Sequence, residues 1–107
     1  MLQSRTTGNT RYWNGCLIFN TVGTYNTALG KDALYSNTIG NTNTAGGYAA
    51  LFSNTNGGGN VANGINALYL NTSGSRNSAF GSYTLDINID GSYNTALGNV
   101  FKYYDWK

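Results

Sequence analysis

The chain has 107 residues, its formal net charge is +2, and only 9% of its residues are charged. Its Lys and Arg residues are scattered, so the clustered basic face that neutralises phosphate groups is absent and nucleic-acid binding is excluded. There is no His or Glu, and the Asp residues are few and scattered, which leaves no pair of groups for acid–base chemistry. We therefore expect no enzyme activity, no metal ion and no cofactor.

The length of the chain allows one domain with a modest core. Designed soluble surfaces carry roughly 25–35% charged residues, so this chain either stays soluble through neutral amides and hydroxyls or hides surface in an assembly. The second interpretation is favoured. No apolar run is long enough to span a membrane, and residues 1–10 lack the apolar core of a signal peptide. We expect neither membrane insertion nor export through a cleaved signal.

After a lead-in over residues 1–5, the sequence repeats with a period of 17 residues. The six units align without a gap, and the first and last are degenerate. They begin at residues 6, 23, 40, 57, 74 and 91. Because every unit solves the same local packing problem, we expect one repetitive domain over residues 6–107.

The first unit contains the segment RYWNGC, in which Arg11 and Trp13 occupy positions that are Ala and Gly in the other units. Both residue types are frequent in binding hot spots, so we predict that they form an end cap or a docking site. Cys16 can form no internal disulfide and matches no metal-ligand spacing, so we interpret it as a small buried apolar residue.

The second unit, residues 23–39, shows the repeat most clearly. Its two turn signals and short length leave no room for a helix pair, but they fit one coil of a parallel β-solenoid. We predict strands over Asn26–Leu29 and Ala33–Tyr35, separated by a Gly corner. Alternation along a strand directs Ala28 and Leu34 inward and the residues that follow them outward.

Residues at equivalent positions of the units form columns along the expected solenoid. The first Asn column contains Asn9, Asn26, Asn43, Asn60, Asn77 and Asn94. The second Asn column contains Asn20, Asn37, Asn54, Asn71 and Asn88. The Ala column contains Ala28, Ala45, Ala62, Ala79 and Ala96, and the Leu column contains Leu17, Leu34, Leu51, Leu68 and Leu85. Inward Asn side chains can hydrogen-bond to one another as ladders, and we favour this role over catalysis or sugar binding.

Large apolar side chains recur at the outward positions next to the Ala and Leu columns. They are Leu29, Tyr35, Phe52, Tyr69, Phe80 and Leu97. Left exposed they would form a larger apolar stripe than monomers usually tolerate. We therefore predict that these residues form an interface between copies of the chain.

The later units contain three further motifs. The glycine run at residues 56–60 lacks the Lys-Ser/Thr pair of a phosphate-binding loop, so we interpret it as a flexible corner. Asn71 begins a glycosylation sequon, interpreted as chance in a chain rich in Asn. Asp86 and Asp90 lie four residues apart, where a structural or Ca²⁺ contact is conceivable, but no further ligand supports one.

The last unit keeps the period but replaces small residues with aromatic ones. These are Phe101, Tyr103, Tyr104 and Trp106. An open solenoid end needs bulky residues to cover it. We predict an end cap or a docking plug here, in preference to a platform that binds sugar.

The units resemble the head repeats of YadA-like trimeric autotransporter adhesins and, still more, the NTALGxxALxxNTxG arrays of phage and viral tail-fibre proteins. The resemblance extends from about Thr6 to Gly98. It implies an all-β fold, a left-handed parallel β-roll of about six 17-residue coils, and association of three rolls into a homotrimer. The repeat is longer than the one common in adhesin heads.

Three functions follow as hypotheses. The favoured one is a non-enzymatic structural or recognition segment of a trimeric fibre on a virion or a cell surface, with a neighbouring fibre or capsid protein, or a host receptor or glycan, as partner. The second is ice binding through two files of Thr. These files contain Thr27, Thr44 and Thr95, and Thr38, Thr55 and Thr72, interrupted by Val61, Ser78 and Ile89. The third is a capsid or appendage component that acts as a scaffold alone.

Overall fold

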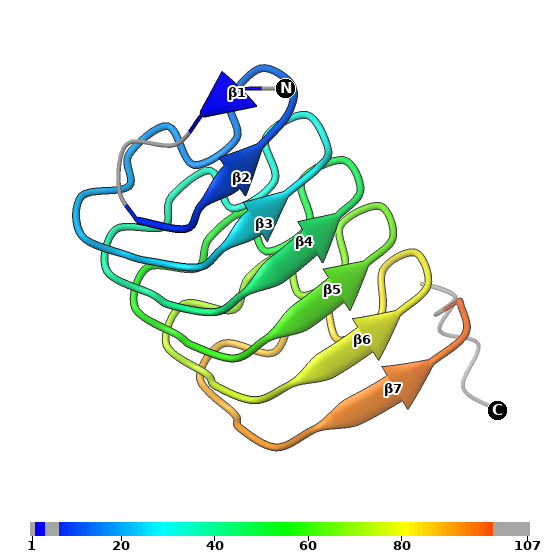
Figure 1. The fold of residues 1–107 in the computed structure, drawn as a ribbon. Coiled ribbons are helices and arrows are strands. Elements are labelled where there is room, and N and C mark those ends of the chain that lie inside the picture. The colour runs from blue at the N-terminus through cyan, green and yellow to red at the C-terminus, as the bar shows by residue number, and fades with distance from the viewer. Residues whose placement is uncertain (1, 4–6, 100–107) are drawn as a thin grey trace, which may run out of the picture.

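The computed structural model describes residues 2–3 and 7–99, and these form a parallel β-solenoid of about five turns with no helix (Figure 1). Within these described residues, seven short strands lie side by side in chain order. They are β1 (Leu2–Gln3), β2 (Thr10–Arg11), β3 (Thr27–Ala28), β4 (Thr44–Gly46), β5 (Val61–Asn63), β6 (Ser78–Phe80) and β7 (Thr95–Leu97). The predicted all-β class and the parallel solenoid are therefore confirmed.

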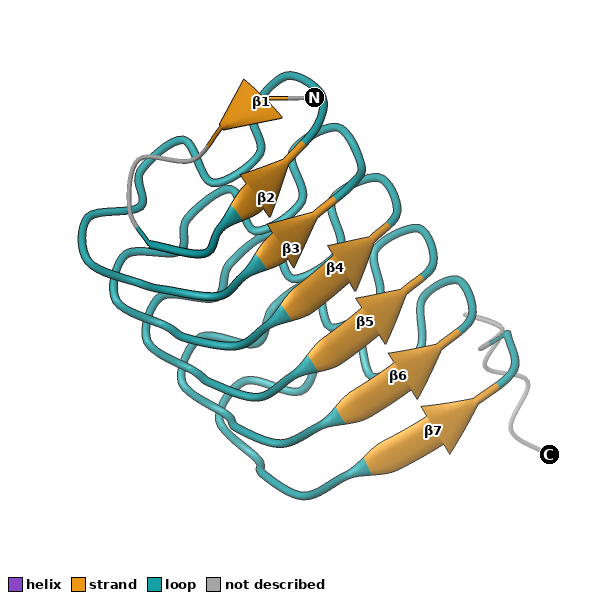
Figure 2. Cartoon of the chain, viewed as in Figure 1, coloured by secondary structure: helices purple, strands orange, loops and turns teal. Residues whose placement is uncertain are grey.

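Each strand from β2 to β6 pairs in parallel with the equivalent strand of the next repeat unit. Thr27 faces Thr44, for example, and Ala28 faces Ala45. This register stacks the equivalent residues of successive coils. Each coil contributes one strand, and these strands form a single sheet along one side of the molecule (Figure 2).

The lead-in contributes a strand that the repeat does not predict. β1 runs antiparallel to β2, with Leu2 opposite Arg11 and Gln3 opposite Thr10. The unpaired edge of a sheet invites pairing with other chains. β1 covers the N-terminal edge of this sheet.

The predicted second strand at Ala33–Tyr35 is wrong, because residues 31–36 form a turn. Asp32 and Leu34 have φ values of 60° and 53°, in the left-handed region that a strand cannot contain. The coils still bond to each other here, since the N–H of Leu34 donates to the carbonyl of Ala50 over 3.0 Å. The predicted strand at Asn26–Leu29 is confirmed, shortened to its two central residues.

The core is a narrow file of small and branched side chains, as predicted. Ala28 and Leu34 are completely buried, and the equivalent residues of the neighbouring coils pack against them. The buried apolar residues of this cluster are Cys16, Leu17, Ala28, Ala33, Leu34, Ala45, Ala50, Leu51, Ala62, Ala67, Leu68 and Ala79.

The second Asn column forms the predicted amide ladder. The Nδ2 group of Asn54 donates to Oδ1 of Asn37 over 2.8 Å and to the carbonyl of Gly57 over 3.0 Å. Asn71 donates in turn to Oδ1 of Asn54 over 3.0 Å. Each buried amide is therefore satisfied by the coil before it, by the coil after it and by its own corner.

The first Asn column uses a different pattern, in which side chain and backbone alternate. The backbone N–H of Asn43 donates to Oδ1 of Asn26 over 2.8 Å. The Nδ2 group of Asn26 donates to the carbonyl of Gly40 over 2.8 Å. These side chains thus clamp the corner of the next coil, so the column does more than the simple ladder that we predicted.

Removing one rung of the second Asn column should destabilise the fold. Asn54→Ala loses the bonds to Asn37 and Gly57 and leaves Nδ2 of Asn71 without one of its acceptors, so we expect a loss of roughly 2–4 kcal/mol. Urea unfolding followed by circular dichroism measures it. Asn63→Ala is the matched control, because Asn63 is exposed on β5, and it should change stability by less than about 0.5 kcal/mol. Equal effects of the two variants would contradict the ladder.

The corner glycines are required by the close approach of successive coils. A Cβ atom on Gly40 would lie 2.5 Å from Oδ1 of Asn37 and 2.9 Å from Nδ2 of Asn54. Gly40→Ala should therefore destabilise the chain by about 1–3 kcal/mol in the same unfolding measurement. Gly46→Ala is the control, since its Cβ would meet only the exposed Asn63 side chain at 3.3 Å. We expect the control to be neutral or stabilising; a well-tolerated Gly40→Ala would refute the packing described.

Candidate functional site

The six residues predicted to form an interface lie in two separate structural contexts. Leu29, Phe80 and Leu97 are at or next to the ends of the strands, on the outer surface of the sheet. Tyr35, Phe52 and Tyr69 project from the turn of each coil that follows the Gly corner.

The residues of the sheet surface are exposed. Leu29 is 49% exposed, Phe80 41% and Leu97 77%. Between the first two, Gly46 and Asn63 occupy the same column, and Gly46 helps to form a hollow of about 370 Å³. Its lining consists of Leu29, Thr44, Gly46, Gly47, Val61 and Asn63. The sheet therefore presents apolar projections on either side of a shallow apolar depression.

The turn residues form an aromatic column whose rings contact one another. The rings of Tyr35 and Phe52 are stacked 4.8 Å apart, those of Phe52 and Tyr69 5.1 Å apart, and Phe19 meets Tyr35 edge-on at 5.3 Å. Such pairs stabilise the fold beyond simple burial. Tyr35, Phe52 and Tyr69 are half-buried as a result, and the facing surfaces of stacked rings are not free to stack on a sugar.

At the N-terminal end, Arg11 and Trp13 play different parts. Arg11 lies on β2, where Nη1 donates to the carbonyl of Cys16 over 3.2 Å, so its guanidinium group helps to close the first coil. Trp13 is 61% exposed and meets Tyr12 edge-on at 6.1 Å. Trp13 thus fits the predicted docking role, which is untested. The C-terminal candidates Phe101, Tyr103, Tyr104 and Trp106 lie outside the described residues.

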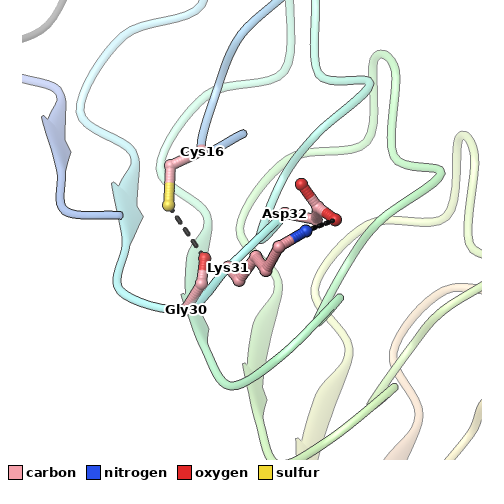
Figure 3. A network of polar contacts seen from close by, with 4 residues as sticks. All are labelled: Cys16, Gly30, Lys31 and Asp32. Carbon is pink, nitrogen blue, oxygen red and sulfur yellow. Dashed lines mark hydrogen bonds and ion pairs between the residues drawn. The ribbon is translucent and has the colours of Figure 1, made fainter. Parts of the chain in front are cut away.

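Cys16 is buried against backbone carbonyl groups, with Sγ 2.9 Å from the oxygen of Gly30 (Figure 3). Sγ also lies 3.3 Å from the carbonyl oxygen of Tyr12. Burial raises the pKa of the Cys16 thiol, against smaller opposing effects of backbone hydrogen bonds and Arg11. The interpretation of Cys16 as a buried structural residue is confirmed.

On the surface nearby, Nζ of Lys31 lies 3.1 Å from the Asp32 carboxylate, which raises the pKa of Lys31.

The hydroxyl groups of the second Thr file bond to the neighbouring coils. The hydroxyl group of Thr38 donates to the carbonyl of Thr55 over 3.2 Å, and that of Thr55 donates to the carbonyl of Thr72 over 3.3 Å. Thr72 donates to Ile89 in the same way over 3.2 Å. These hydroxyl groups support the stacking of the coils, which makes them poor donors to an ice lattice.

A notch at the glycine run is the feature that the sequence analysis did not identify as a site. It has a volume of about 310 Å³ and lies where Gly58 and Gly59 replace the side chains that other coils carry. Its lining consists of Asn41, Thr42, Asn56, Gly58, Gly59, Ser75 and Arg76. All of these residues are polar or Gly, so the notch offers hydrogen-bonding groups.

Over the described residues, no three His, Cys, Asp or Glu side chains come together as a group that could hold a metal ion. The same residues contain no helix with the length and apolar character to cross a membrane. No family model, no curated protein and no solved structure matches the chain. The function is therefore inferred from the geometry.

Cys16 should be protected from alkylation in the folded chain. Its raised pKa lowers the thiolate fraction, and its burial blocks access, so iodoacetamide should react at least roughly tenfold more slowly than with the urea-unfolded chain. The unfolded chain loses the thiol proton at lower pH, so the stability due to this group is present below the ordinary Cys pKa and falls as pH rises above it. Mass spectrometry measures the alkylation. Equal rates in the two states would contradict the burial of Cys16.

Proposed function

We propose that the chain is a non-enzymatic structural and recognition segment of a trimeric fibre, in which three left-handed β-rolls lie side by side on a virion or cell surface. The observation that carries the proposal is the exposed apolar column Leu29, Phe80 and Leu97 on the sheet. The resemblance of the repeat to fibre and adhesin heads is consistent with three copies.

The sheet surface has the chemistry of a protein interface. Burying a Leu or Phe side chain against a neighbour contributes about 1.5–3 kcal/mol, and the column offers three such side chains, Leu29, Phe80 and Leu97. The hollow at Gly46 has room for one projection of a neighbouring copy. Leu29, Phe80 and the hollow at Gly46 lie along the same column. If a second copy is shifted along the solenoid axis, its Leu29 or Phe80 side chain would therefore enter the hollow of the first copy.

The hydrogen bonds between coils support a role as an extended structural segment. Buried amide groups connect every described coil to the next, so the solenoid does not depend on a large central core. Repeat proteins of this kind can lengthen by adding coils, since each coil contacts its neighbours alone. The recognition partner, a neighbouring fibre or capsid protein or a host receptor or glycan, would meet the ends or the outer turns.

The proposal is tested by the mass of the chain in solution. Multi-angle light scattering should give three times the mass of one chain at micromolar concentration. Phe80→Lys combined with Leu97→Lys should produce folded monomers, because the charges would have to be desolvated in the interface. Ile39→Lys is the control, since Ile39 is as exposed as Leu29 but lies outside the sheet, and it should leave the trimer intact. A stable monomer of the unaltered chain would refute the proposal.

A further inference from the structure

The notch at Gly58 and Gly59 interrupts a file of hydrogen bonds that runs along one corner of the solenoid. In this file, the backbone N–H at the second position of a unit donates to a side-chain oxygen of the next unit. Thr24 donates to Oδ1 of Asn41 over 2.7 Å, Gly58 to Oγ of Ser75 over 3.0 Å, and Ser75 to Oγ of Ser92 over 2.9 Å.

Between Thr24 and Ser75, the one break in this file falls at Asn41. The residue that would supply the acceptor for its N–H is Gly58, which has no side chain. Within residues 2–3 and 7–99, no protein atom accepts a hydrogen bond from the N–H of Asn41. A Cβ atom on Gly58 would lie 3.9 Å from this nitrogen, so the missing oxygen would have stood inside the notch.

A positive charge borders the same notch. The guanidinium group of Arg76 lies over the ring of Tyr93, 5.8 Å from its centroid, and Arg76 lines the notch. No carboxylate of the described residues pairs with it. Within residues 2–3 and 7–99 the guanidinium N–H groups donate no hydrogen bond to the protein, so they are available for a ligand.

We propose that the notch binds an oxyanion, a carboxylate or sulfate group carried by a small polar molecule. One oxygen of the anion accepts the hydrogen bond of the Asn41 N–H and takes the place of the side-chain oxygen that Gly58 lacks. A second oxygen pairs with Arg76, whose N–H groups match the geometry of a carboxylate. The amide of Asn56 and the hydroxyl of Thr42 line the remaining volume and suit a hydroxylated molecule.

The volume sets the size of the ligand. About 310 Å³ is at the lower end of the range of small-molecule sites, which suits a molecule of about the size of a sugar acid. The site is built within a single chain from neighbouring coils. It is therefore independent of the oligomeric state proposed above.

Binding is tested by titrating the intact chain with sodium glucuronate, sodium sulfate and glucose at constant ionic strength, followed by two-dimensional amide NMR. Glucuronate should shift the Asn41 amide resonance in a saturable manner, whereas glucose at the same concentration should not. A response to sulfate as well identifies a general oxyanion site, and a response to glucuronate alone identifies a carboxylate site. Failure of both anions to saturate any shift would overturn the proposal.

Gly58→Ser supplies the missing oxygen and should abolish the binding. Ser occupies this position in the next two units, so the variant should fold and be at least as stable as the unaltered chain. Thermal unfolding checks this point. Thr7→Ser is the matched control, because it changes the same column two coils away from Asn41, and it should bind normally. Undiminished binding by a folded Gly58→Ser variant would refute the site.

Arg76→Gln should weaken the anion affinity by roughly tenfold or more, because it removes the charge-assisted pair. Lys31→Gln removes the same net charge from a different corner and should have little effect. Equal losses in the two variants would mean that the anion responds to net charge alone, and the proposal would then be wrong. The two variants thus distinguish anion binding at the notch from a general attraction to the positive charge of the chain.

Discussion

The hydrogen bonding of buried Asn side chains between coils is the constraint on which the rest of the structure depends. Asn37 and Asn54 are completely buried, and a buried amide is tolerated only when its donors and acceptor are satisfied. For the buried residues of the two Asn columns, the side-chain bonds join the equivalent residue one period away or a corner carbonyl. This requirement explains the invariant spacing, the parallel register and the corner glycines, since a change in any of them would move an amide away from its partner.

The same stacking holds a backbone that would otherwise be unfavourable. Leu34 and its equivalents adopt left-handed φ values, as do Tyr25 and Asp32, and each such residue costs of order 1–3 kcal/mol when it is not Gly. Bonds between coils pass through these turns at every level, for example from Ser36 to Phe52 at 3.0 Å. The turn is therefore stabilised by hydrogen bonds to the adjacent coils, and an isolated coil would lack the bonds that offset its strained backbone.

The column pattern predicted which side chains face inward because burial has the same period as the repeat. Ala28, Leu34, Asn26 and Asn37 were placed correctly on this basis. The pattern could not predict the turn at Leu34, since Leu is common in strands and the left-handed conformation is imposed by contacts between coils. The notch was missed because what defines it is the side-chain oxygen that Gly58 lacks, and no residue marks it in the sequence. It becomes visible in the sequence when Gly58 is compared with Thr24 and Ser75 at the same position.

The direction of the amide ladder makes the two ends of the solenoid chemically different. From Asn37 to Asn88, every Nδ2 group of the second Asn column donates to the preceding coil, so all of these amides point the same way. Most backbone bonds between coils run the other way, since an N–H such as that of Leu34 donates to the following coil, so the peptide dipoles oppose those of the ladder. Two such solenoids placed head to tail would continue the ladder of side-chain donors and acceptors, whereas head to head they would set donor against donor. The internal ladder therefore distinguishes the two directions of a growing filament.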